Sequence, residues 1–157
     1  MLIHQMIEYN AQNYPTQNAL RFGGKAITYG QFNARATAFA AGLQGLGLKP
    51  GSRLALLAKN SLEYPLLLLA CLKAGITLVP LNYRLAPMEL SYILSDSKSE
   101  MLVVGDEELL NAAAQSDAVA GIAHRFHCGE ANPIMATSKI PFCSYIPVAQ
   151  PVTPRVS

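Results

Sequence analysis

The most concentrated group of metal-binding residue types is formed by His124, His127 and Cys128, with Cys143 farther along the chain. Imidazole nitrogen and thiolate sulfur are the ligands that Zn²⁺ prefers, and four of them could complete a tetrahedron. The spacing matches no common structural zinc pattern, and there is no closely spaced pair of cysteines. We therefore predict a polar loop at a domain edge here and keep a small zinc site as the lesser alternative.

Acidic and basic side chains offer a second kind of chemistry. Asp106, Glu107 and Glu108 are consecutive, but a catalytic pair needs surroundings that separate two pKa values, and no neighbouring apolar or basic segment provides them. Like charges after a strand are typical of a helix start or a solvated surface, and we predict that role. Arg84 is the one basic residue expected at the mouth of a sheet, and we favour a surface role for it over anion binding.

The motifs for nucleotide binding are incomplete. A P-loop needs a glycine five positions before Gly-Lys, and Ala19 stands there relative to Gly24. The pair Gly45 and Gly47 lacks the third glycine of the dinucleotide fingerprint, because Pro50 takes its place, and the pair ends a predicted helix instead of opening one. We interpret these glycines as turn and cap residues. The nucleophile motif Gly-x-Ser-x-Gly is also missing from the sequence.

Composition indicates a globular protein without a membrane span. Of the 157 residues 51% are hydrophobic and 14% are charged, which suits one domain with a substantial core. The net charge of +2 is far from the strongly basic balance of a nucleic-acid binder. No apolar stretch approaches about 20 residues, and no signal peptide is evident. The three cysteines are too few for a disulfide framework, and Cys71 is expected to be a buried, inert thiol, so we predict a cytoplasmic protein.

The N-terminal part should hold a helix, a hairpin and a second helix. We expect a short amphipathic helix before Pro15 and a β-hairpin around Gly23-Gly24. Thr28 and Gln31 form a capping box, which predicts a helix that begins there and ends at Gly47. Apolar residues recur along this helix at steps of four and three and form one stripe: Phe32, Ala36, Phe39, Leu43 and Leu46.

Three short apolar runs, 53–58, 76–81 and 100–104, indicate buried strands. Helical segments separate them, the first beginning near the cap-like pair Asn60 and Glu63. The alternation predicts an α/β fold, a parallel-sheet βαβαβ subdomain with the N-terminal helix and β-hairpin. Ligands in such sheets usually sit beyond the carboxyl ends of the strands. The loops expected at that edge are 59–61, 82–86 and 105–107.

The composition changes near the C-terminus. From residue 131 onward the chain has five of its ten prolines and only two charged residues, Lys139 and Arg155. Such a segment cannot sustain a helix. We therefore predict an α/β unit over residues 1–118 and a Pro-rich, irregular or disordered tail over residues 119–157.

Five segments carry a family resemblance, in order along the chain. They are Pro50-Gly51-Ser52-Arg53-Leu54-Ala55, Asn60-Ser61-Leu62-Glu63-Tyr64, Leu72-Lys73-Ala74-Gly75, Val79-Pro80-Leu81-Asn82-Tyr83-Arg84-Leu85 and Glu89-Leu90-x-Tyr92-Ile93-Leu94-x-Asp96-Ser97. Together with Thr28-Tyr29 they resemble the adenylate-forming ligases, which include acyl- and aryl-CoA synthetases, luciferases and peptide-synthetase adenylation domains. The resemblance covers about residues 2 to 105. The segment from Pro80 to Leu85 is more similar to the CoA ligases than to the peptide synthetases.

The resemblance implies the fold of the N-terminal part of the large domain of acyl-CoA synthetases. It also implies ATP-dependent activation of a carboxylate to an acyl-adenylate and transfer to CoA, with Mg²⁺ as a further cofactor of the family. The family's phosphate loop is matched only vaguely, by Thr137-Ser138-Lys139, and no glycine follows Gly129. We therefore predict no catalytic, cofactor-binding or metal-binding residue in this chain and transfer no active-site residue from the family.

Two functions remain open. The first is an N-terminal fragment of an AMP-dependent synthetase/ligase, truncated and inactive alone, from an enzyme of the fatty-acid metabolism type. Such a fragment should expose apolar surface and tend to self-associate. The alternative is a non-catalytic interaction or regulatory module that pairs with a ligase subunit. In both cases the family's substrates are a carboxylic acid, ATP and CoA, and no nucleic acid is expected as a partner.

Overall fold

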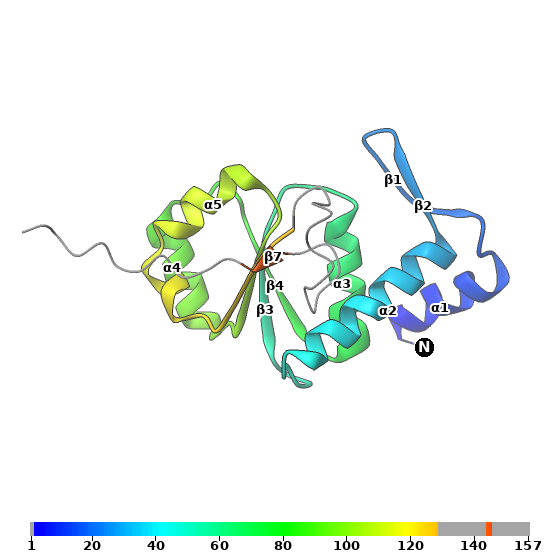
Figure 1. Cartoon of the computed structure of the whole chain (residues 1–157), viewed down its shortest axis with the longest axis horizontal. Coiled ribbons are helices and arrows are strands. Elements are labelled where there is room, and N and C mark those ends of the chain that lie inside the picture. Colours follow the sequence, from blue (N-terminus) through cyan, green and yellow to red (C-terminus); the bar gives the residue numbers. More distant parts are fainter. Residues whose placement is uncertain (1, 129–143, 146–157) are drawn as a thin grey trace, which may run out of the picture.

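The computed structural model describes residues 2–128 and 144–145. A five-stranded sheet lies between two layers of helices, with α2 (Tyr29–Gly45) and α3 (Glu63–Ala74) on one face. On the other face lie α4 (Pro87–Ser97), α5 (Glu107–Ala114) and the 3₁₀ helix η1 (Asp117–Gly121). A helix and a hairpin extend the molecule beyond α2, at the end opposite α4 (Figure 1). None of the helices within residues 2–128 combines the length and the apolar composition that a membrane-spanning helix needs.

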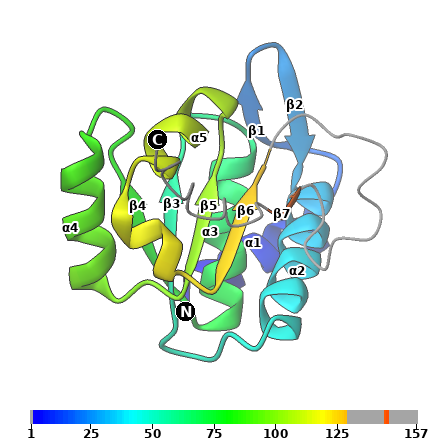
Figure 2. The ribbon, with the colours of Figure 1, turned by 60° about the vertical axis from the view of Figure 1, so that its left-hand side comes forward.

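The strands of the main sheet have the spatial order β4-β3-β5-β6-β7 (Figure 2). The first four run parallel, and β7 is antiparallel to β6. Their bounds are β3 (Arg53–Leu57), β4 (Thr77–Leu81), β5 (Met101–Val104), β6 (His124–His127) and β7 (Ser144–Tyr145). The predicted α/β fold with a parallel sheet is confirmed. Its strands run parallel because helical crossovers connect successive strands.

The N-terminal elements are α1 (Ile3–Asn13), β1 (Asn18–Phe22) and β2 (Lys25–Thr28). The strands pair antiparallel around Gly23 and Gly24, which have φ angles of +55° and +77°. Two positive φ angles suit a tight hairpin turn, and glycine reaches them without strain. The predicted hairpin is therefore confirmed.

The capping box at the start of α2 is confirmed. The Gln31 N–H donates to Thr28 Oγ1 at 3.3 Å, and the Thr28 N–H donates to Gln31 Oε1 at 3.1 Å. The helix ends before Gly47, whose φ is +89°, as its predicted cap role requires. At the start of α2, side-chain oxygens thus accept two backbone N–H groups within one turn.

The start of α3 differs from its prediction. The hydroxyl of Ser61, and not the side chain of Asn60, accepts the N–H of Tyr64 at 3.3 Å, and α3 begins at Glu63 with Leu62 at the N-cap. The serine hydroxyl is the nearer acceptor because it stands three residues before the donor, the separation that helix starts favour. At the other end of α3, Gly75 takes a left-handed conformation, with a φ of +70°.

Beyond the predicted boundary at residues 118 and 119, residues 119–128 differ from the irregular tail that the sequence predicts. His124–His127 form β6, which pairs in parallel with β5, and the η1 helix packs beneath it against the sheet. Residues up to Cys128 thus belong to the α/β unit, since the Cys128 N–H donates to Val104 O at 2.9 Å. Residues 129–143 and 146–157, most of the predicted tail, lie outside the described part of the chain.

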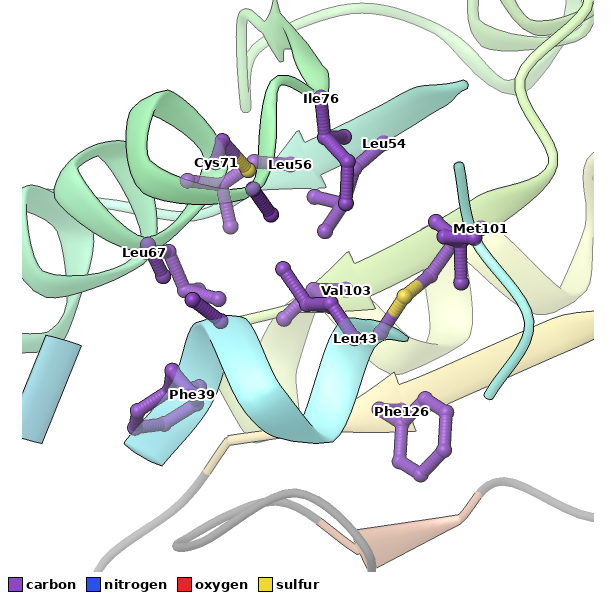
Figure 3. Packing of buried hydrophobic residues seen from close by; sticks show 14 of the residues in the cluster. Phe39, Leu43, Leu54, Leu56, Leu67, Cys71, Ile76, Met101, Val103 and Phe126 are labelled. Carbon is purple, nitrogen blue, oxygen red and sulfur yellow. The ribbon is translucent and has the colours of Figure 1, made fainter. Parts of the chain in front are cut away.

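The core lies on both faces of the sheet, because alternate residues of each central strand point to opposite sides. Leu54 and Val103 face α2 and α3, while Leu57 and Val104 face α4 and α5. Strands that are buried on two sides are apolar throughout, as parallel strands are. Figure 3 shows the larger of these clusters, in which Phe39 points toward the sheet from α2.

An apolar contact of Ile7 and an ion pair of Glu8 connect helix α1 to the rest of the chain. None of its residues is fully buried, but Glu8 forms an ion pair with Lys73 of α3, whose side chain is only 10% exposed. The hydrogen bond from Lys73, and to a smaller degree the charges of Lys73 and His4, lower the pKa of Glu8 despite an opposing effect of burial. The charged form of Glu8 therefore favours the docked helix.

Replacing Glu8 by Gln should make this contribution visible through pH. Because the folded-state pKa lies below the ordinary value of 4.5, the stabilisation is present above that value and is lost as pH falls through the lowered pKa. At neutral pH the free energy of unfolding of the wild type should exceed that of Glu8→Gln by about 1 kcal/mol or less, since the Glu8 carboxylate is partly exposed and screened by solvent. Thermal unfolding of both proteins between pH 2 and 7, about the acidic range of carboxylates, checks this. A stability difference between the two proteins that is the same at every pH would contradict this prediction.

Candidate functional site

The carboxyl ends of β3, β4 and β5 meet at one edge of the sheet, where an open α/β sheet usually binds its ligand. The loops that follow these strands include Lys59, Tyr83 and Asp106, each from a different loop. These residues are more than 20 positions apart in the sequence, and the parallel register of the strands brings them to the same edge. This edge is the candidate site.

Two strand ends approach each other very closely at this edge. The Gly105 N–H donates to Leu57 O at 2.9 Å. A Cβ atom at residue 105 would lie 2.5 Å from the Cβ of Ala58, closer than real Cβ contacts. Glycine is required here for space and not for a positive φ. The close approach brings the loop after β5 directly against the loop after β3.

Lys59 connects the two loops in two ways. Its backbone N–H donates to Asp106 Oδ2 at 2.9 Å, and its Nζ lies 2.6 Å from Glu108 Oε2. The hydrogen bond to Glu108 raises the pKa of Lys59, and the same bond lowers the pKa of Glu108. Both side chains are exposed, so this pair orients the loops more than it stabilises the fold.

An aromatic ring borders the pair on the side of β4. The Arg84 guanidinium carbon lies 5.4 Å from the Tyr83 ring centroid, and the Lys59 Nζ lies 6.0 Å from it. The Arg84 N–H donates to Asn82 Oδ1 at 3.0 Å, which holds the loop in a local turn. Arg84 is exposed, as predicted, and it stacks on Tyr83.

The acidic run forms a helix start, as predicted. Asp106 is the N-cap residue of α5, and Glu107 and Glu108 lie in its first turn, near the positive end of the helix dipole. The carboxylate of Asp106 makes no cap hydrogen bond, because it accepts the N–H of Lys59 instead. The role of Lys59 was missed, since its partners lie 47 and 49 residues away and no local pattern signals such a contact.

The histidine and cysteine group is not the polar loop that the sequence predicts. His124 and His127 stand at the two ends of β6, and their separation of three places them on opposite faces of the sheet. Cys128 is disulfide-bonded, which differs from the expectation of reduced cysteines, and Cys143 lies outside the described residues. Within the described part of the chain, no three His, Cys, Asp or Glu side chains cluster as metal ligands do. The cytoplasmic location stays a prediction.

Cys71 is the buried thiol that the sequence predicts. It lies in α3 with 1% of its surface exposed and packs among the apolar side chains of Figure 3. Burial raises its pKa to about 12. A thiol in that state is a poor nucleophile and metal ligand at neutral pH.

The described residues at this edge of the sheet do not fit a nucleotide triphosphate. Three carboxylates, of Asp106, Glu107 and Glu108, surround the N-terminus of α5, where an anion would otherwise meet free N–H groups. The charge of Lys59 is already paired with Glu108. The segment Thr137-Ser138-Lys139, the vague match to a phosphate loop, lies outside the described residues. That this chain has no catalytic or cofactor-binding residue stays a prediction.

Curated relatives match about two thirds of the chain. A fatty acid–[acyl-carrier-protein] ligase, ScoC, from Streptomyces coeruleorubidus is 40% identical over 103 residues, which are 66% of this chain and 20% of that protein. A feruloyl-CoA synthase from an Amycolatopsis species is 39% identical over 104 residues, 66% of this chain and 21% of that protein. The chain thus spans about a fifth of the length of these curated relatives.

Solved structures show the same fold. The N-terminal domain of FACL13 from Mycobacterium tuberculosis superposes with a TM-score of 0.73 and 34% identity, over 81% of this chain and 34% of that one. The family of AMP-binding enzymes matches residues 7–143, most of the sequence. Both the sheet topology and this match agree with the resemblance found in the sequence. The chain belongs to the AMP-binding enzyme family.

Proposed function

We propose that this chain provides the N-terminal α/β scaffold of an ATP-dependent carboxylate ligase of the acyl-CoA synthetase type, and that it forms no acyl-adenylate by itself. In the complete reaction a carboxylate, ATP and CoA would give acyl-CoA, AMP and pyrophosphate. ATP, Mg²⁺ and CoA would be cofactors or substrates of that complete enzyme. The relatives named above act on a fatty acid and form feruloyl-CoA, so the acid is a fatty or aromatic carboxylic acid.

From the contacts of one residue, Lys59, we infer that the chain forms no acyl-adenylate. At the carboxyl edge of the sheet, the position where the fold would place a ligand, Lys59 is bound to Asp106 and Glu108. Adenylation needs cations and backbone N–H groups directed at the phosphates, to stabilise charge as the carboxylate attacks. The described loops present carboxylates there instead. The chain would thus position other parts of an enzyme without binding the triphosphate.

The exchange of labelled pyrophosphate into ATP tests this proposal. The purified 157-residue chain is assayed with Mg²⁺ and with a long-chain fatty acid or ferulate, and circular dichroism confirms that it is folded. We expect no exchange above the reaction without protein. An active acid–CoA ligase added to the same mixture should restore exchange, which shows that the chain does not inhibit the assay. Carboxylate-dependent exchange in proportion to the amount of this chain would contradict the proposal.

A further inference from the structure

We draw no further inference here: the strongest candidate, the buried side chain of Arg125 between β6 and η1, already donates through its Nη1 to the carbonyls of Val119 and Ala120, and nothing in the described part of the structure shows what its unpaired Nε would bind.

Discussion

Replacing Gly105 by alanine is expected to destabilise the chain by about 1–3 kcal/mol, the range of an overpacked core position. The added Cβ would lie 2.5 Å from the Cβ of Ala58, and both atoms are attached directly to the backbone of a central strand end. Neither can rotate away, so β3 and β5 must separate where Gly105 donates to Leu57. Urea denaturation at equilibrium measures the loss.

A second substitution separates this clash from other effects. Ala58→Gly removes the opposing methyl group, so the double variant Ala58→Gly/Gly105→Ala should recover part of the stability lost in Gly105→Ala. Gly45→Ala serves as the matched control, because nothing lies within 4 Å of a Cβ at that position of α2. It should be neutral or slightly stabilising. Effects of Ala58→Gly and Gly105→Ala that simply add would refute the proposed clash.

Replacing Phe39 by alanine is expected to cost about 3–5 kcal/mol, as for other buried aromatic residues. Its ring is 1% exposed and packs between α2 and the sheet, in the cluster that also contains Leu43, Leu54 and Val103 (Figure 3). The sheet strands that face this cluster are themselves buried, so the surrounding structure has little freedom to fill the cavity that Phe39→Ala leaves. Denaturation by urea should show a lower midpoint with an unchanged slope.

The exposed aromatic Phe22 gives the matched comparison. It is 50% exposed, so Phe22→Ala should change the free energy of unfolding by about 0.5 kcal/mol or less, as typical surface substitutions do. The measurements are made at low protein concentration, where self-association does not contribute. Similar losses in Phe39→Ala and Phe22→Ala would show that the cluster of Figure 3 is not the main core.

Local signals in the sequence were sufficient for much of the fold. The capping box of Thr28 and Gln31, the turn at Gly23-Gly24 and the helix end at Gly47 depend on residues only a few positions apart. Helix starts and tight turns are determined by such short-range hydrogen bonds and backbone preferences. The alternation of apolar strands with helices then determined the parallel sheet.

The features that the sequence did not reveal depend on distant contacts. Strand β6 has the sequence His-Arg-Phe-His, which lacks the apolar run of a central strand, and its burial comes from β5 and η1. Arg125 is buried there because its Nη1 donates to Val119 O and Ala120 O, the carbonyls of η1. The contacts of Lys59 with the loop after β5 likewise join residues almost 50 positions apart.

A calorimetric titration with ATP and Mg²⁺ tests most directly whether this chain is a scaffold without a triphosphate site. The titration uses the folded 157-residue chain at neutral pH, and magnesium chloride alone serves as the blank. We expect no saturable heat up to about 1 mM ATP, which corresponds to a binding free energy weaker than about 4 kcal/mol. One ATP bound per chain with a dissociation constant in the micromolar range would contradict it.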